Sequence, residues 1–170
     1  MKRLLAILTA VATAIATGAC TKPPKPPADA PGPASSIVPL SAEIRTAYLA
    51  YWAAWETANA ESDLPDTGLA AHTGLPLLET LQANLVAARA RHEVTRGAVT
   101  HRISGMVPAI AGGYTVVDCI DLDRWLLHDA RTGAVLDQLV DKPSQLTLTT
   151  MRSDSGVWKA TSLYPQGECP

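Results

Sequence analysis

Phenylalanine is absent from this chain of 170 residues, and charged side chains make up only 18% of it. Apolar residues reach 47%, which is enough for a packed core and argues against a wholly disordered chain. Residues 41–170 hold 10 basic and 15 acidic side chains, a net charge of −5. This balance argues against a nucleic-acid partner, because phosphate binding needs clustered Lys and Arg side chains.

The common catalytic and cofactor motifs are also missing. The chain has no G-x-S-x-G, no Walker loop and no G-x-G-x-x-G. His72, His92 and His128 show no i, i+4 pairing of the kind that holds zinc. These absences remove the common hydrolases and nucleotide-dependent enzymes, and we expect neither a metal ion nor a cofactor.

The apolar run at the amino terminus is short. Lys2 and Arg3 precede 13 weakly apolar residues, 4–16. A permanent membrane-spanning helix needs about 20 such residues. A positive head, a short apolar stretch and small residues after it are typical of an export signal.

Residues 17–20, Thr-Gly-Ala-Cys, resemble the lipobox of bacterial lipoproteins, in which small residues precede a cysteine that receives diacylglycerol. Thr17 departs from the pattern, where an aliphatic residue is usual. The resemblance implies that residues 1–19 are a signal peptide and that acylated Cys20 attaches the protein to membrane lipid, on the extracytoplasmic face. Ordinary cleavage after Ala16, which would give a secreted protein, is the competing interpretation.

Proline dominates the next segment, residues 20–40, with seven prolines between positions 23 and 39. Such density favours polyproline II and removes backbone donors, so we predict a stiff tether between membrane and domain. Lys22 and Lys25 favour anionic lipid headgroups beside the anchor. A proline-rich docking motif is the alternative.

The chain has three cysteines, and an exported protein meets an oxidising compartment. If Cys20 carries lipid, Cys119 and Cys169 remain as one pair, and we predict a disulfide between them. A catalytic Cys119 is the alternative, but no nucleophile signature surrounds it.

Residues 41–170 form the predicted domain, beginning with two helices at 42–61 and 75–92. Ser41 is the expected N-cap of the first helix, and Leu side chains form the stripe of the second. Residues 63–74 are broken by Pro and Gly, with one helical turn expected around Leu69.

After Gly97 the pattern changes to alternating, β-branched residues. Strands are predicted at 98–106, 114–121, 125–128, 145–152 and 157–164, with 135–140 as a further short candidate. Helices followed by a run of strands predict an α+β fold, with the helices on one face of an antiparallel sheet.

Four stretches carry a resemblance to a known group: AYLAYWAAW, GAVTHRISG, VVDCIDLDRWLLHDARTG and VWKATSLYPQGEC. They resemble exported lipoproteins and secreted proteins of high-GC Gram-positive bacteria. The domain of that group is similar to the nuclear transport factor 2-like (SnoaL-like, cystatin-like) fold. The resemblance implies a long first helix across a curved sheet, with a conical cavity between them.

Half of all the aromatic residues lie in the first predicted helix, as Tyr48, Tyr51, Trp52 and Trp55. They are expected to fill the core of a protein without Phe. The alternative is that Tyr48, Trp52 and Trp55, together with Trp125, line a pocket for an apolar ligand.

His101 and Asp118 are ionisable residues in the middle of predicted strands. On a curved sheet both side chains would be able to face the cavity and exchange protons with a ligand, as His and Asp do in SnoaL-like cyclases and isomerases. Alternatively, Asp118 bonds backbone groups or an Arg at the sheet edge, and His101 lies on the solvated face. The cluster of Asp118, Asp121 and Asp123 lacks the Gly and Glu of a calcium loop, and we interpret it as a strand-end bend.

Three functions follow from these observations. The first is a membrane-anchored extracytoplasmic lipoprotein whose domain binds a small apolar ligand or an envelope protein without catalysis. The second is a scaffold or assembly subunit of a membrane complex, with the sheet face as its interface and as the surface of a homodimer. The third is an isomerase or cyclase that uses His101 and Asp118.

Overall fold

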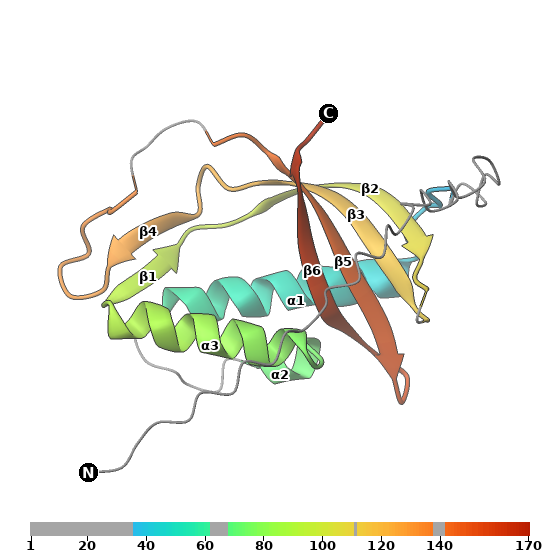
Figure 1. The fold of residues 1–170 in the computed structure, drawn as a ribbon, viewed down its shortest axis with the longest axis horizontal. Helices are drawn as coiled ribbons and strands as arrows, with labels where there is room; N and C mark the ends of the chain where they lie inside the picture. Colours follow the sequence, from blue (N-terminus) through green and yellow to red (C-terminus); the bar gives the residue numbers. More distant parts are fainter. Residues whose placement is uncertain (1–35, 62–67, 111, 138–141) are drawn as a thin grey trace, which may run out of the picture. The chain divides into compact units, whose positions relative to one another are not determined.

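A computed structural model describes residues 36–61, 68–110, 112–137 and 142–170 of the chain (Figure 1). The predicted signal peptide, Cys20 and all but the last residues of the predicted tether lie outside these ranges. Of the described helices, none is long and apolar enough to cross a membrane. The elements, in chain order, are α1 (Ala42–Ala60), α2 (Leu69–His72), α3 (Leu77–Ala90), β1 (Glu93–Arg96), β2 (Thr100–Pro108), β3 (Tyr114–Asp121), β4 (Leu126–Asp129), β5 (Gln145–Asp154) and β6 (Val157–Glu168).

The strands form two antiparallel sheets. Four of them pair in the order β2-β3-β5-β6, and β1 pairs with β4 in a separate two-stranded sheet. Figure 1 shows the helices on one side of the strands, with α1 passing beneath β5 and β6. The predicted α+β class, with helices packed on antiparallel strands, is confirmed.

The first helix begins where the sequence predicts. Ser41 caps it, because its side-chain oxygen accepts a hydrogen bond of 3.3 Å from the backbone N–H of Ile44. The buried face of α1 carries the aromatic side chains toward the sheet, where they form the core with Val116, Met151 and other side chains of the sheet. On β3, Val116, Asp118 and Ile120 are buried on the face toward α1, while Thr115 and Val117 are half-buried; Cys119 is also buried and forms the disulfide.

The chain between α3 and β2 differs from the prediction. The second helix ends at Ala90, two residues early, because His92 takes a positive φ of 58° that no helix continues. Glu93–Arg96 then form β1, a strand that the sequence analysis missed. Val135 makes an isolated bridge to His128 and no strand, and residues 138–141 of the predicted strand lie outside the described part.

The described chain starts along the free edge of β2. The backbone N–H of Val38 donates to the Met106 carbonyl and the N–H of Met106 to the Val38 carbonyl, both at 2.9 Å. Gly105 allows this approach, because its φ is +148° and a Cβ there would lie 2.5 Å from the Val38 carbonyl oxygen. The segment before α1 is therefore fastened to the sheet by backbone bonds.

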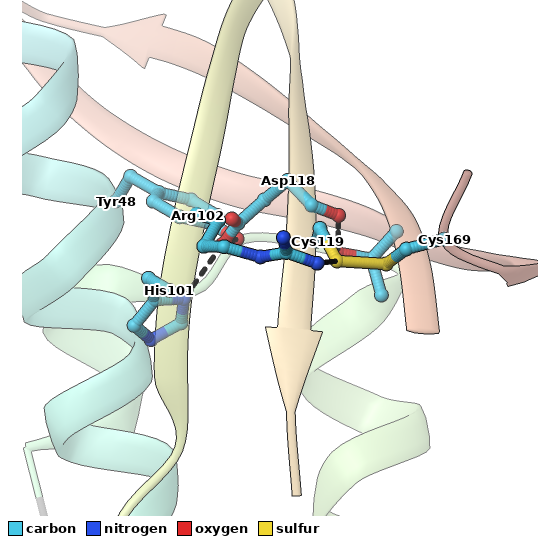
Figure 2. The surroundings of a disulfide bond; sticks show 7 residues. Tyr48, His101, Arg102, Asp118, Cys119 and Cys169 are labelled. Carbon is cyan, nitrogen blue, oxygen red and sulfur yellow. Dashed lines mark hydrogen bonds and ion pairs between the residues drawn. A yellow bond between two sulfur atoms is a disulfide. The ribbon is translucent and has the colours of Figure 1, made fainter. Parts of the chain in front are cut away.

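The predicted disulfide is present. Cys119 of β3 and Cys169, the residue after β6, are joined across a separation of 50 residues. Figure 2 shows the bond beside Arg102, whose guanidinium donates to Cys119 Sγ at 2.8 Å. The carboxyl terminus is thus linked to a central strand of the sheet.

Candidate functional site

A buried polar cluster joins α1 to the sheet. The Tyr48 hydroxyl donates to Asp118 Oδ2 at 2.8 Å, and His101 Nδ1 lies 2.6 Å from the same oxygen. Figure 2 shows Tyr48 and His101 on the side of α1, with the Asp118 side chain approaching both from β3. The two candidate residues of the sequence analysis, His101 and Asp118, are therefore in direct contact.

Strand register explains this contact. His101 lies opposite Ile120 in the β2–β3 ladder, and Asp118 is two residues from Ile120. Because side chains two residues apart share a face, His101 and Asp118 are diagonal neighbours on the face toward α1.

The carboxyl group of Asp118 is fully buried, with 0% of its side chain exposed. Its Oδ2 receives both contacts, while Oδ1 is buried without a hydrogen-bond partner among the described residues. Burial, reinforced by the neighbouring Asp118 charge and hydrogen bond, raises the pKa of Tyr48 well above its usual range. Tyr48 therefore stays protonated and acts as a fixed donor to the carboxylate.

The imidazole of His101 is held by aromatic rings as well as by Asp118. Its centroid lies 5.7 Å from the Tyr48 ring in an edge-on contact and 5.2 Å from the Trp52 ring. The His101 side chain keeps 15% of its surface exposed. With Nδ1 facing Asp118, Nε2 is the ring nitrogen that remains for another partner.

The aromatic pocket candidates lie within or against the core. Tyr48 and Tyr51 are fully buried, Trp52 and Trp55 are at most 8% exposed, and all four belong to the main hydrophobic cluster. Trp125 is half-buried and packs against that cluster. The expectation that aromatic side chains fill the core is met at these positions, and their role in ligand binding stays a prediction.

A hollow lined by described residues lies on the outer face of the four-stranded sheet, opposite α1. Its volume is about 680 Å³ and every strand of that sheet contributes to it. Leu75, Ile110 and Tyr164, three strongly exposed apolar residues, belong to its lining. A second hollow of about 460 Å³ adjoins it and shares Leu75, Arg152 and Thr161 with it.

Of the three residues in the predicted strand-end bend, Asp121 and Asp123 form such a bend, whereas Asp118 is buried inside β3 and contacts Tyr48 and His101 instead. Asp121 Oδ1 accepts from the backbone N–H of Asp123 at 2.9 Å, and Asp123 Oδ1 accepts from the backbone N–H of Lys142 at 2.8 Å. In the part of the chain that the structure describes, no three His, Cys, Asp or Glu side chains gather into a metal-binding group.

The sequence analysis missed two features of these sites. It treated Tyr48 only as an aromatic side chain, although the spacing of α1 places its hydroxyl toward the sheet. It also gave no role to Arg152 and Lys159, which face each other across β5 and β6 at the rim of the smaller hollow. The orientation of the Tyr48 hydroxyl and the pairing of Arg152 with Lys159 both depend on helix and strand register, which no local sequence motif reveals.

Comparison with known proteins identifies the fold alone. No protein-family model matches the chain, and no curated protein matches it. Among solved structures, the crystal structure of the intermembrane space region of chloroplast protein ARC6 is similar, with a TM-score of 0.50 and 14% sequence identity. The match covers 75% of this chain and 99% of the ARC6 region.

Proposed function

We propose that this protein is an extracytoplasmic lipoprotein, anchored through acylated Cys20, whose domain binds an apolar ligand on the outer face of its sheet and does no chemistry. The hollow of about 680 Å³ on that face carries the proposal, because it combines a ligand-sized volume with exposed apolar side chains. Between helix and sheet, the buried side chains of Tyr48, Tyr51 and Trp52 belong to the packed core.

The export signal and the proline-rich segment support the location outside the cytosol. The disulfide agrees with an oxidising compartment. The similar ARC6 structure is likewise that of an intermembrane space region. We further propose that the domain is a nuclear transport factor 2-like one, because a long first helix lies beneath an antiparallel sheet.

Native mass spectrometry of the protein, isolated gently from its own membrane, tests both the lipid anchor on Cys20 and the binding of a ligand on the outer face. We expect the mass of a diacylated chain that begins at Cys20, and a retained ligand that is lost in a Leu148→Asn variant, which changes the floor of the hollow. A Cys20→Ser variant should appear in the medium or with its signal peptide uncleaved. An unlipidated wild-type chain would contradict the anchor, and ligand retained by Leu148→Asn would contradict the surface.

A second candidate function has one observation in its favour. His101 with its Nδ1 on a buried carboxylate has the arrangement of an oriented general base, whose Nε2 would exchange the proton. This favours the isomerase or cyclase alternative. Turnover of an enolisable ketone that His101→Gln abolishes while leaving the melting temperature unchanged would support it, and equal turnover in both proteins would exclude it.

A further inference from the structure

The two adjoining hollows differ in chemistry. The larger is walled mainly by apolar side chains, among them Val107, Pro108 and Leu148. The smaller is lined by Arg152 and Lys159, together with Asp154. Since they share Leu75, Arg152 and Thr161, an apolar trough ends at a pair of cations.

The two cations are direct cross-strand partners. Arg152 on β5 pairs with Lys159 on β6, next to the buried pair of Met151 and Ala160. Because successive side chains alternate between faces, Arg152 and Lys159 both project from the outer face. Like charges directly opposite each other destabilise a sheet, so this pair has an electrostatic cost.

The two cations have no ion-pair partner within the described ranges, and with Asp154 the lining of the smaller hollow keeps a net charge of +1. The Lys159 ammonium donates instead to the Ala70 carbonyl at 2.9 Å. The Asp154 carboxylate accepts a hydrogen bond of 3.3 Å from the Ser155 hydroxyl and forms no ion pair with either cation among the described residues. An anion at this end of the trough would relieve the repulsion between the two cations.

The apolar end offers few hydrogen bonds to a ligand. The hydroxyls of Thr115 and Thr150 bond each other at 3.4 Å, and Thr161 Oγ1 donates to the Thr150 carbonyl at 3.3 Å. The backbone groups of the two central strands, β3 and β5, are paired in ladders on both sides. A peptide would leave its own amides unsatisfied there, whereas a hydrocarbon chain needs no partners.

We propose that this surface binds a single-chain anionic amphiphile, with its hydrocarbon chain in the trough and its carboxylate or phosphate on Arg152 and Lys159. The cations Arg152 and Lys159 at one end complement an anionic headgroup, and the apolar walls along the rest of the trough fit a hydrocarbon chain. The inference deepens the proposed function, because it rests on the outer face being the binding surface and names the ligand.

The test uses the full chain in phosphatidylcholine nanodiscs and photoreactive diazirine probes of one chain length. The headgroups are a carboxylate, a phosphate monoester, an uncharged glucoside and a trimethylammonium. We expect the two anionic probes to label peptides of β5 and β6 at least ten times more strongly than the cationic one. The ratio of carboxylate to phosphate labelling distinguishes a free fatty acid from a lysophospholipid as the source. Each methylene removed from the chain should weaken competition about two- to fourfold.

Variants separate charge from hydrophobic contact. Arg152→Gln with Lys159→Gln should abolish the anionic preference, while the matched control, Arg45→Gln with Arg96→Gln, removes two exposed cations away from the trough and should keep it. Leu75→Ser, at a residue 63% exposed, should weaken all four probes without affecting folding.

Equal labelling by anionic and cationic probes, or an unchanged preference in the Arg152/Lys159 variant, would overturn the inference. Loss of probe labelling in Leu75→Ser together with no headgroup preference would leave the proposed surface intact and refute only the anionic ligand. No labelling of the outer face by any probe would refute both. A dimer that the anionic probes fail to dissociate would assign the trough to a second copy and also overturn the inference.

Discussion

Tyr48 and Asp118 lie 70 positions apart in the chain, and a hydrogen bond of 2.8 Å joins them in the interior. This bond attaches α1 to the centre of the four-stranded sheet. Asp118 has 0% exposure, so its carboxylate depends on protein partners for the solvation that water would otherwise supply.

Removing the Tyr48 hydroxyl should therefore destabilise the fold. We expect Tyr48→Phe to lower the free energy of unfolding by about 1.5–3 kcal/mol, the range for a hydrogen bond to a charged group. Guanidinium unfolding measures it. Tyr164→Phe, at an exposed tyrosine, is the control and should change stability by less than about 0.5 kcal/mol. Equal effects of the two variants would contradict the structural role of the bond.

Alkaline pH should weaken the fold through Tyr48 and Tyr51. Burial raises the pKa of both hydroxyls above their usual range. Above about pH 10 the unfolded chain releases these protons while the folded protein keeps them, so stability present below pH 10 is lost as the pH rises. Each tyrosine contributes a slope of about 1.4 kcal/mol per pH unit.

Urea unfolding at pH 9, 10 and 11 tests this slope. The slope should become shallower in Tyr51→Phe and in Tyr48→Phe, because each variant removes one buried hydroxyl of raised pKa. If the free energy of unfolding of Tyr51→Phe falls with pH as steeply as that of the wild type, the Tyr51 hydroxyl does not cause the loss of stability.

The disulfide should contribute a large part of the stability. A bridge across 50 residues contributes about 4 kcal/mol in the chain-entropy model. Cys119→Ser with Cys169→Ser should lose this amount in denaturant unfolding, and a reducing agent should have the same effect on the wild type. The double variant should then be insensitive to reductant. A wild-type melting temperature that reductant leaves unchanged would argue that the bond is absent in solution.

Two neighbouring glycines offer a matched pair of variants. Gly112 and Gly113 both have positive φ, 88° and 82°. A Cβ at Gly113 would lie 2.2 Å from the Met151 carbonyl oxygen, whereas one at Gly112 meets nothing within 4 Å. Both Ala variants should lower the free energy of unfolding by about 1 kcal/mol, because alanine disfavours a positive φ. Gly113→Ala should lose about 1–3 kcal/mol more, because its Cβ meets the Met151 carbonyl oxygen. Thermal unfolding with equal losses for both variants would contradict the predicted contact.

Where local pattern determined structure, the sequence was a good guide. Tyr114–Asp121 was predicted with its observed bounds, since Gly residues precede it and β-branched residues fill it. The first helix was predicted to within a residue, because Ser41 caps it and its apolar residues recur at helical spacing.

Structure that depends on pairing between distant segments was not predicted from the sequence. The strand Glu93–Arg96 has one buried apolar residue, Val94, and forms because Leu126–Asp129 lies beside it. The contact between His101 and Asp118 depends on the register of two strands. No residue spacing encodes that register in a single sequence, so the two candidates were named separately but not as a pair.

The bridge between Val38 and Met106 determines which contact resists a force that pulls on the chain before α1. A pull on the chain ahead of Ser36 is resisted first by two backbone hydrogen bonds at the edge of β2. The four-stranded sheet therefore bears such a force before the first turn of α1 does. The aromatic core between α1 and the sheet is loaded only after the contact between Val38 and Met106 breaks.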